Sequence, residues 1–210
     1  MKFAIGITTL NRVDLLLPSL IKYSFDFKDV DIHIIDNGKQ SLSFIEEINP
    51  CFHVHEQPHN IGVAGSWNKL CHLIFKNYDN ALIINDDVYL GYGTNVVDDV
   101  ITEYPYSLIQ SFASWSVFSI SKHMYDYIGD FDEIFYPAYY EDSDYIYRMK
   151  LKGIRQDVTE KLNPQVLRIS MTQEKDPELV NESMKINRER YISKWGNSPL
   201  LEPFLTPYNK

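Results

Sequence analysis

The chain has 210 residues, 44% of them hydrophobic and 23% charged, which is enough for one α/β domain with its own core. Its formal net charge of −9 argues against non-specific nucleic-acid binding, which requires a basic surface. The chain has only two cysteines, Cys51 and Cys71, and its start turns polar too quickly for a signal peptide. No stretch is long enough for a membrane span. These features favour a reduced, cytoplasmic protein.

The first half of the chain alternates short apolar runs with segments of helical spacing. Strands are predicted at residues 3–9, 30–35, 51–55 and 81–84, and helices at 14–23 and 66–75. Pro18 falls inside the first helix, so that helix is expected either to start near Leu16 or to be kinked. This order predicts a Rossmann-like, mostly parallel central sheet with flanking helices.

The second half is richer in aromatic residues. We expect one or two strands within 107–119, a short helix at 121–128, an aromatic loop at 131–140, and helices at 141–152 and 176–195. Residues 162–175 show no clear period and are expected to form a loop. Because no repeat or linker separates the halves, residues 1–210 are predicted to form one domain with two functional halves, 1–100 and 101–210.

Polar residues stand where the predicted strands end: Thr8 and Thr9, Asp36, and the pair Asp86 and Asp87. Ligands of parallel α/β sheets bind outside the carboxyl ends of the strands. Adjacent carboxylates repel each other, and Mg²⁺ or Mn²⁺ bridging to a diphosphate would compensate. A solvated turn is the alternative for the pair, and a turn aspartate is the alternative for Asp36. The other strand ends favour a metal site at the pair.

A second acidic cluster, Glu141-Asp142-Ser143-Asp144, opens a predicted helix. Acidic residues favour helix N-termini for dipole reasons alone. However, three carboxylates in four residues exceed what a first turn needs, and the aromatic run before them would raise the pKa of a shielded carboxyl toward that of a general base. The local pattern supports both interpretations equally.

Other motifs narrow the choice of chemistry. The chain contains neither G-x-G-x-x-G nor G-x-x-x-x-G-K-[ST], which disfavours NAD binding and P-loop nucleotide hydrolysis. His53 and His55 would share one face of a strand, but no Cys or His follows at the spacing of a zinc site. A zinc site is therefore not expected from this segment.

Residues 3–196 resemble the GT-A glycosyltransferases, specifically the inverting family 2 type. The resemblance is carried by the order and spacing of five segments: residues 7–12, 34–38, 60–68, 85–87 and 129–148. Of these, Asn85-Asp86-Asp87 stands where the family has its D-x-D motif. Lys194-Trp195-Gly196 resembles the ending of many bacterial-type members, rhamnosyltransferases among them.

The resemblance implies a role for each matching residue. The nucleobase, expected to be uracil, would be surrounded by Thr8, Leu10, Arg12 and Asp36. Asp86 would hold the ribose, Asp87 with Asp86 beside it would bind the metal, and Asn60 and Asn68 would line the donor pocket. Asp142 would be the general base, with Glu141 or Asp144 positioning the sugar or acceptor. Candidates for stacking on the acceptor are Trp115, Tyr136, Tyr139 and Tyr140.

The expected activity is an inverting, metal-dependent transfer of a hexose or deoxyhexose, of the glucose or rhamnose type. The donor would be a UDP-sugar such as UDP-glucose, the acceptor a glycan hydroxyl, and the cofactor Mn²⁺ or Mg²⁺. Two departures bear on the metal: Asn85 replaces the first acid of D-x-D, and Arg168 or Ser170 stands where relatives supply a late histidine. The alternatives are a non-catalytic sugar-nucleotide or glycan-binding module and a sugar-phosphate nucleotidyltransferase.

Overall fold

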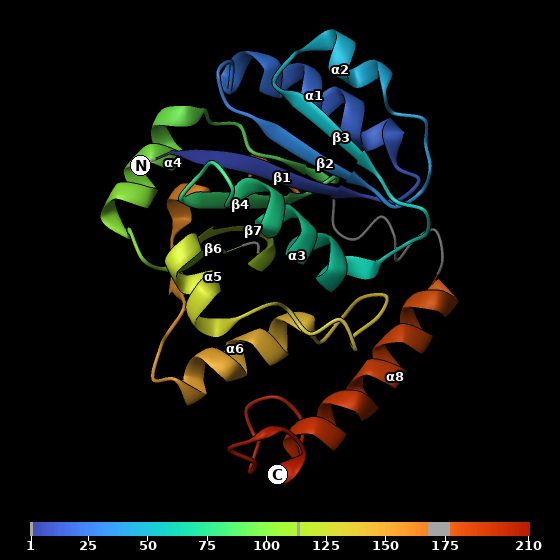
Figure 1. Ribbon diagram of the computed structural model, residues 1–210, viewed down its shortest axis with the longest axis vertical. Helices are drawn as coiled ribbons and strands as arrows, with labels where there is room; N and C mark the ends of the chain where they lie inside the picture. The colour runs from blue at the N-terminus through green and yellow to red at the C-terminus, as the bar shows by residue number, and fades with distance from the viewer. Residues whose placement is uncertain (1, 113, 168–176) are drawn as a thin grey trace.

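A seven-stranded mixed sheet runs through the middle of the molecule, in the order β3-β2-β1-β4-β7-β6-β8 (Figure 1). The computed structural model describes residues 2–112, 114–167 and 177–210. The strands of the sheet are β1 (Phe3–Thr9), β2 (Ile32–Asp36), β3 (Phe52–Glu56), β4 (Asn80–Asn85), β6 (Leu108–Ser111), β7 (Ser114–Ser121) and β8 (Asp157–Val158). A separate antiparallel pair joins β5 (Val88–Tyr89) to β9 (Val166–Leu167).

Strands β1 to β4 are parallel, whereas β7 pairs antiparallel with both β4 and β6. In this register Thr9 lies opposite Asp36, Asp36 lies opposite Glu56, and Thr8 lies opposite Asn85. The carboxyl ends of the four parallel strands therefore meet at one edge of the sheet, as a binding site there requires.

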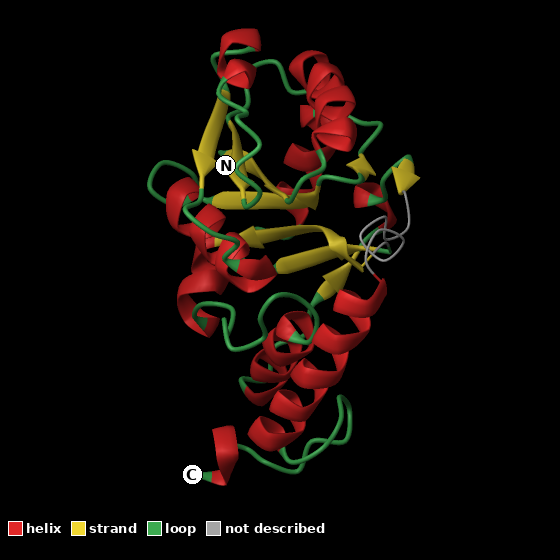
Figure 2. Ribbon diagram, turned by 90° about the vertical axis from the view of Figure 1, so that its right-hand side faces the viewer, coloured by secondary structure: helices red, strands yellow, loops and turns green. Residues whose placement is uncertain are grey.

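Helices cover both faces of the sheet (Figure 2). They are α1 (Val13–Asp26), α2 (Phe44–Ile48), α3 (Gly62–Ile74), α4 (Thr94–Glu103), α5 (Lys122–Ile128), α6 (Glu141–Leu151) and α8 (Pro177–Trp195), with short 3₁₀ turns at Glu160–Leu162 and Pro207–Asn209. Along β4, Leu82 and Ile84 belong to the core under α1 and α4, whereas Ala81 and Ile83 belong to the core under α3 and α5. A strand buried on both faces accounts for its unbroken apolar sequence.

The last helix packs away from the sheet. Tyr191 and Trp195 of α8 form a third apolar cluster with Phe135 of the aromatic loop and Tyr147 of α6. Figure 1 shows α8 beside α6, at the end of the molecule farthest from α1 and α2. The segment 131–140 is thereby held between the sheet-bound half of the chain and its C-terminal helix.

The predicted α/β class, with a mostly parallel sheet and flanking helices, is confirmed. Helix α1 begins at Val13 and continues through Pro18, so a start near Leu16 is wrong, and α3 begins four residues before the predicted 66. Helices α2 and α4 were not predicted. Most of the expected loop at 162–175, with Arg168 and Ser170, lies outside the described residues. No helix in the described part of the chain is long and apolar enough to cross a membrane.

Candidate active site

Asp86 follows the end of β4 and bonds to the end of β1. Its carboxylate accepts hydrogen bonds from the Thr9 side chain and the Leu10 backbone. Burial nevertheless raises the pKa of Asp86 to about 6, and the neighbouring charge of Asp87 adds to this, because those hydrogen bonds and the charge of Arg12 offset only part of the desolvation. Asp86 is thus a carboxyl group that titrates near neutral pH.

The neighbouring Asp87 has an unsatisfied oxygen. Its Oδ1 is buried and has no hydrogen-bond partner, and burial raises the pKa of the group. Buried polar atoms are normally hydrogen-bonded, so such an atom points to a missing partner. A carboxylate oxygen at the carboxyl edge of a sheet is a ligand that Mg²⁺ and Mn²⁺ prefer, so the donor set fits a hard divalent cation.

Arg12 is buried beside these carboxylates and is paired with a third. Its Nε and Nη2 donate to Asp14 at 3.1 and 3.2 Å, and these bonds raise the pKa of Arg12, with the charges of Asp86 and Asp87 adding to the effect. The guanidinium therefore partly balances the acidic pair. Thr8 is half-buried and Leu10 is exposed at the same edge.

Asp36 is fully buried and shapes its own loop. Its Oδ1 accepts from the backbone N–H of Gly38 at 2.8 Å and from Nε2 of Gln40 at 3.0 Å, and its Oδ2 accepts from the backbone N–H of Gln40 at 2.7 Å. Asp36 therefore shapes the turn that follows β2, and because each carboxylate oxygen can accept a further hydrogen bond, its predicted nucleobase contact stays a prediction.

Asn37, which the sequence analysis did not single out, joins the end of β2 to the start of α3. Its Nδ2 donates to Oγ of Ser66 at 2.8 Å, and its Oδ1 accepts from the backbone N–H of Ile61 at 3.1 Å. Asn60 accepts from the backbone N–H of Gly62 at 2.9 Å. The polar contacts of this segment therefore fix the start of α3.

Gly62 brings the start of α3 against the aromatic loop. Its φ of +74° is in the left-handed region, and a Cβ there would lie 2.9 Å from the carbonyl oxygen of Pro137. The next residue, Val63, donates its backbone N–H to that same oxygen at 2.8 Å. The strand-end loops and the segment that leads into α6 are therefore in direct contact.

Helix α6 begins with one buried and one half-buried carboxyl group. Oε2 of Glu141 is buried without a partner, and burial, followed by the charge of Asp142, raises the pKa of Glu141 to about 8. Asp142 is half-buried; its Oδ1 accepts from the backbone N–H of Ser143 at 2.6 Å, and burial raises its pKa. Tyr139 and Tyr140, which precede the pair, have φ values of +77° and +75°, a strained conformation for residues with side chains.

Two residues that were predicted to contact the acceptor are buried among structural partners. Asp144 is fully buried, and its carboxylate accepts from Nε of Arg148 at 2.8 Å, Nζ of Lys194 at 2.6 Å and Nε1 of Trp195 at 2.8 Å. It therefore anchors α8 to α6. Trp115 is also buried; its ring stacks on Trp67 with centroids 5.6 Å apart, so it belongs to the core.

The remaining predicted residues divide between surface and interior. Tyr136 is exposed, whereas Tyr139 and Tyr140 are half-buried and Tyr140 packs on Tyr191. Asn68 is buried: its Oδ1 accepts from the backbone N–H of Phe131 at 2.7 Å, and its Nδ2 donates to the carbonyl oxygen of the same residue at 2.9 Å. Asn68 thus fixes the start of the aromatic loop.

Asn68 also reaches a cavity of about 390 Å³ that Asp132, Arg148 and Lys194 help to line. Neither this cavity nor a second one of about 460 Å³ along α3 includes the strand-end carboxylates. The candidate site is therefore defined by its unsatisfied carboxyl groups.

Comparison with known proteins identifies the fold. No family model and no curated protein matches the chain. Among solved structures, a mannosyltransferase from Pyrobaculum calidifontis, in complex with GDP-Man and Mn²⁺, matches 97% of this chain and 68% of its own, with 10% identity and a TM-score of 0.69. Glucosyl-3-phosphoglycerate synthase from Mycobacterium tuberculosis, in complex with Mn²⁺, UDP and glucosyl-3-phosphoglycerate, also matches. The match covers 93% of this chain and 80% of the synthase chain, with 14% identity and a TM-score of 0.59.

GalNAc-T7 with UDP, GalNAc and Mn²⁺ matches 77% of this chain, with 9% identity and a TM-score of 0.58, and this chain spans 43% of it. At these identities the likeness shows the fold, which is the GT-A type found in nucleotide-diphospho-sugar transferases. The predicted type of fold is thereby confirmed.

Proposed function

We propose that this protein is a glycosyltransferase that takes a sugar from a nucleoside-diphosphate donor with the help of a divalent cation. One observation carries the proposal: in the described residues, the carboxyl groups whose pKa lies above its ordinary value are Asp86, Asp87, Glu141 and Asp142, and burial is the largest cause for each. Perturbed carboxyl groups concentrate at functional sites, and these stand at the two positions where GT-A chemistry needs a metal and a base.

Asp87, with Asp86 beside it, would hold Mn²⁺ or Mg²⁺ at the end of β4. When bound, the cation neutralises negative charge on the leaving diphosphate, which is worth several kcal/mol in such reactions. Thr9 and the Leu10 backbone orient Asp86, which we assign to the ribose or to the cation. Arg12 lies near enough to both carboxyl groups for its positive charge to lower their pKa values.

Asp142 is proposed as the general base. The acceptor oxygen attacks the anomeric carbon, its proton passes to Asp142, and the bond from that carbon to the diphosphate oxygen breaks, with its electron pair leaving on the nucleotide. Burial raises the pKa of Asp142 and so strengthens it as a proton acceptor, a contribution of roughly 10²–10⁴-fold. Glu141, with a pKa of about 8, is protonated near neutral pH and places no second negative charge beside it.

A direct displacement of this kind inverts the anomeric carbon. We propose a UDP-sugar donor of the glucose or rhamnose type and a glycan hydroxyl as acceptor, following the resemblance of the motifs at residues 7–12, 34–38 and 60–68. Residues 1–100 would then bind the donor, and residues 101–210 would bind the acceptor. A nucleotidyltransferase is disfavoured because Thr8-Thr9-Leu10-Asn11-Arg12 contains no glycine-rich loop. A binding module would not need the buried pair at the start of α6.

The test combines two variants with a matched control. Calorimetry with UDP, with and without Mn²⁺, should show metal-dependent binding in the wild type and in Asp142→Asn, and its loss in Asp87→Ala. Transfer or slow donor hydrolysis should be lost in Asp142→Asn, while Asp99→Asn, on the exposed face of α4, should behave as the wild type. UDP affinities that do not depend on Mn²⁺ in any of the proteins would count against the metal site. Unimpaired turnover by Asp142→Asn would refute the assignment of Asp142 as the general base.

A further inference from the structure

Three histidines and an aspartate gather on one face of strands β2 and β3. His33 on β2 lies directly opposite His53 on β3, and His55 follows two residues later on the same face. Asp31 immediately precedes β2. All four side chains are half-buried, so they are partly shielded and still accessible to an ion.

The ligand atoms of three of these residues converge. One carboxylate oxygen of Asp31 and one ring nitrogen each of His33 and His53 lie within 4.8 Å of one another. Nε2 of His53 is 3.3 Å from Oδ1 of Asp31. Two ligands in a tetrahedral zinc site with bonds of about 2.0–2.1 Å are about 3.3 Å apart, so this pair already has the required separation.

Neighbouring groups hold the convergent side chains in place. Nε2 of His55 is 3.1 Å from Nδ1 of His33, and the hydrogen bond between these two nitrogens orients the His33 ring. Tyr78 donates its hydroxyl to Oδ2 of Asp31, which leaves Oδ1 directed at His53. Metal-binding histidines and carboxylates are characteristically oriented by such outer hydrogen bonds.

We propose that Asp31, His33 and His53 form a binding site for a divalent transition metal of the zinc type, separate from the glycosyl-transfer site. Two imidazoles and one carboxylate are ligands suited to Zn²⁺, and water would complete a tetrahedral shell. Hard cations such as Mg²⁺ prefer all-oxygen sites, so the two proposed metal sites differ in selectivity.

A cation held by Asp31, His33 and His53 would bridge β3, the edge strand of the sheet, to β2.

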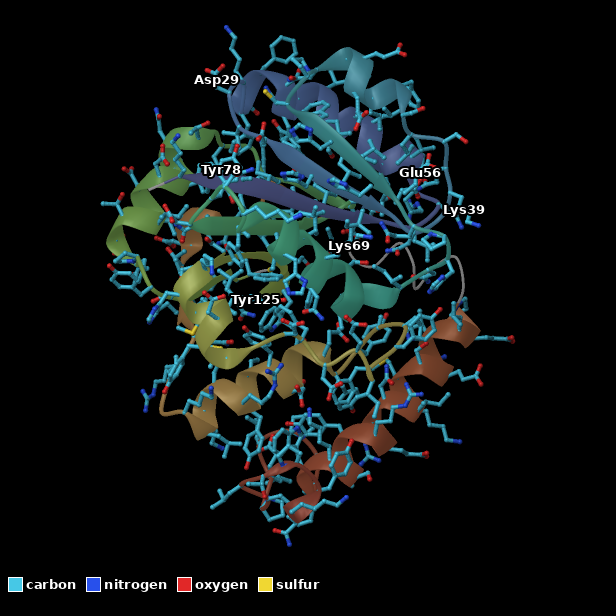
Figure 3. All side chains as sticks on the ribbon, in the orientation of Figure 1. Asp29, Lys39, Glu56, Lys69, Tyr78 and Tyr125 are labelled. Carbon is cyan, nitrogen blue, oxygen red and sulfur yellow. The ribbon has the colours of Figure 1, made fainter. Side chains whose placement is uncertain are left out.

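The site lies away from the carboxyl edge of the sheet. Asp31 precedes the first residue of β2, whereas Asp36 ends that strand. Figure 3 shows Tyr78 at one end of the sheet and Lys39 and Glu56 at the other. Spacing along residues 53–59 could not reveal the site, because Asp31 and His33 come from the preceding strand.

The experiment titrates the full, metal-free chain with ZnCl₂ by calorimetry. Because Zn²⁺ also binds carboxylates, each titration is repeated in the Asp87→Ala background, which removes the other proposed metal site. We expect one Zn²⁺ per chain to remain in that background. His53→Gln and Asp31→Asn should each weaken it by more than the roughly 10–100-fold typical of outer groups, and Tyr78→Phe should weaken it by about 10-fold.

His72→Gln is the matched control, because His72 and Asp130 form an exposed histidine–aspartate pair, 3.3 Å apart, to which the described residues add no third ligand. It should bind Zn²⁺ as the wild type does. Co²⁺ in place of Zn²⁺ should give a visible spectrum that disappears in His53→Gln. Absence of Zn²⁺ binding in the Asp87→Ala background, or wild-type affinity in both ligand variants, would overturn the proposal. Neither result would bear on sugar transfer.

Discussion

The buried Glu141 makes the stability of this protein depend on pH in a predictable direction. Its pKa is 4.5 in an unfolded chain and about 8 in the folded protein, because burial penalises the charged form. Below pH 4.5 the group is neutral in both states. As pH rises from 4.5 through about 8, the unfolded chain releases its proton first, so the free energy of unfolding falls.

The magnitude follows from the pKa difference. A rise from 4.5 to about 8 is about 3.5, and at about 1.36 kcal/mol for each pKa unit the loss amounts to a few kcal/mol. Glu141→Gln keeps the shape of the side chain and removes the titration. The variant should therefore gain stability relative to the wild type as pH rises through this range, and the gain should level off above about pH 8.

Urea unfolding across a pH series, with a chelator present, measures this difference. The other shifted groups, such as Asp86 and His33, are present in both proteins, so their contributions cancel in the comparison. A second variant, Asp142→Asn, should lower the pKa of Glu141, because the charge of Asp142 contributes to its rise. A stability difference between Glu141→Gln and wild type that stays within about 1 kcal/mol over the whole range would refute the reasoning.

Two further predictions concern packing. Asp144→Ala should destabilise the fold by roughly 3 kcal/mol in urea unfolding, because it leaves Lys194 and Trp195 without a buried partner; a loss below 1 kcal/mol would contradict this. Gly62→Ala should cost more stability than Gly153→Ala, since both have similar φ values (+74° and +72°) but only the first Cβ meets Pro137; equal thermal shifts would show that strain alone matters.

Periodicity predicted the sheet because its signals are local. The runs at β1 and β4 are apolar on both faces, and β2 and β3 carry apolar residues mainly at alternate positions. The turn and capping residues Ser121 and Gly129 delimit α5 where expected. Helix α4 escaped detection because its buried positions are only Val97, Val100 and Ile101, a short stripe in a polar segment.

The structural contacts of two predicted site residues come from distant parts of the chain. Asp144 resembles its neighbour Asp142 in sequence, and it is buried only because Lys194 and Trp195, fifty residues later, reach its carboxylate. From the sequence alone Trp115 is a candidate for stacking on a ligand, but in the structure its ring is stacked against Trp67 of α3. Local spacing in the sequence cannot show that α8 packs against Asp144 or that α3 packs against Trp115. The burial of these two side chains therefore became evident only in the structure.

The allocation of buried positive charge supports the same division. Lys194 is buried and donates to Asp144 and Asp132, and the Arg148 guanidinium also bonds to Asp144. These cations could have neutralised other carboxylates of the same helix, yet Glu141 and Asp142 receive only hydrogen bonds from backbone and serine donors. An uncompensated buried carboxyl group is destabilising, and under the proposed function this cost is offset because the raised proton affinity of Asp142 serves the transfer step.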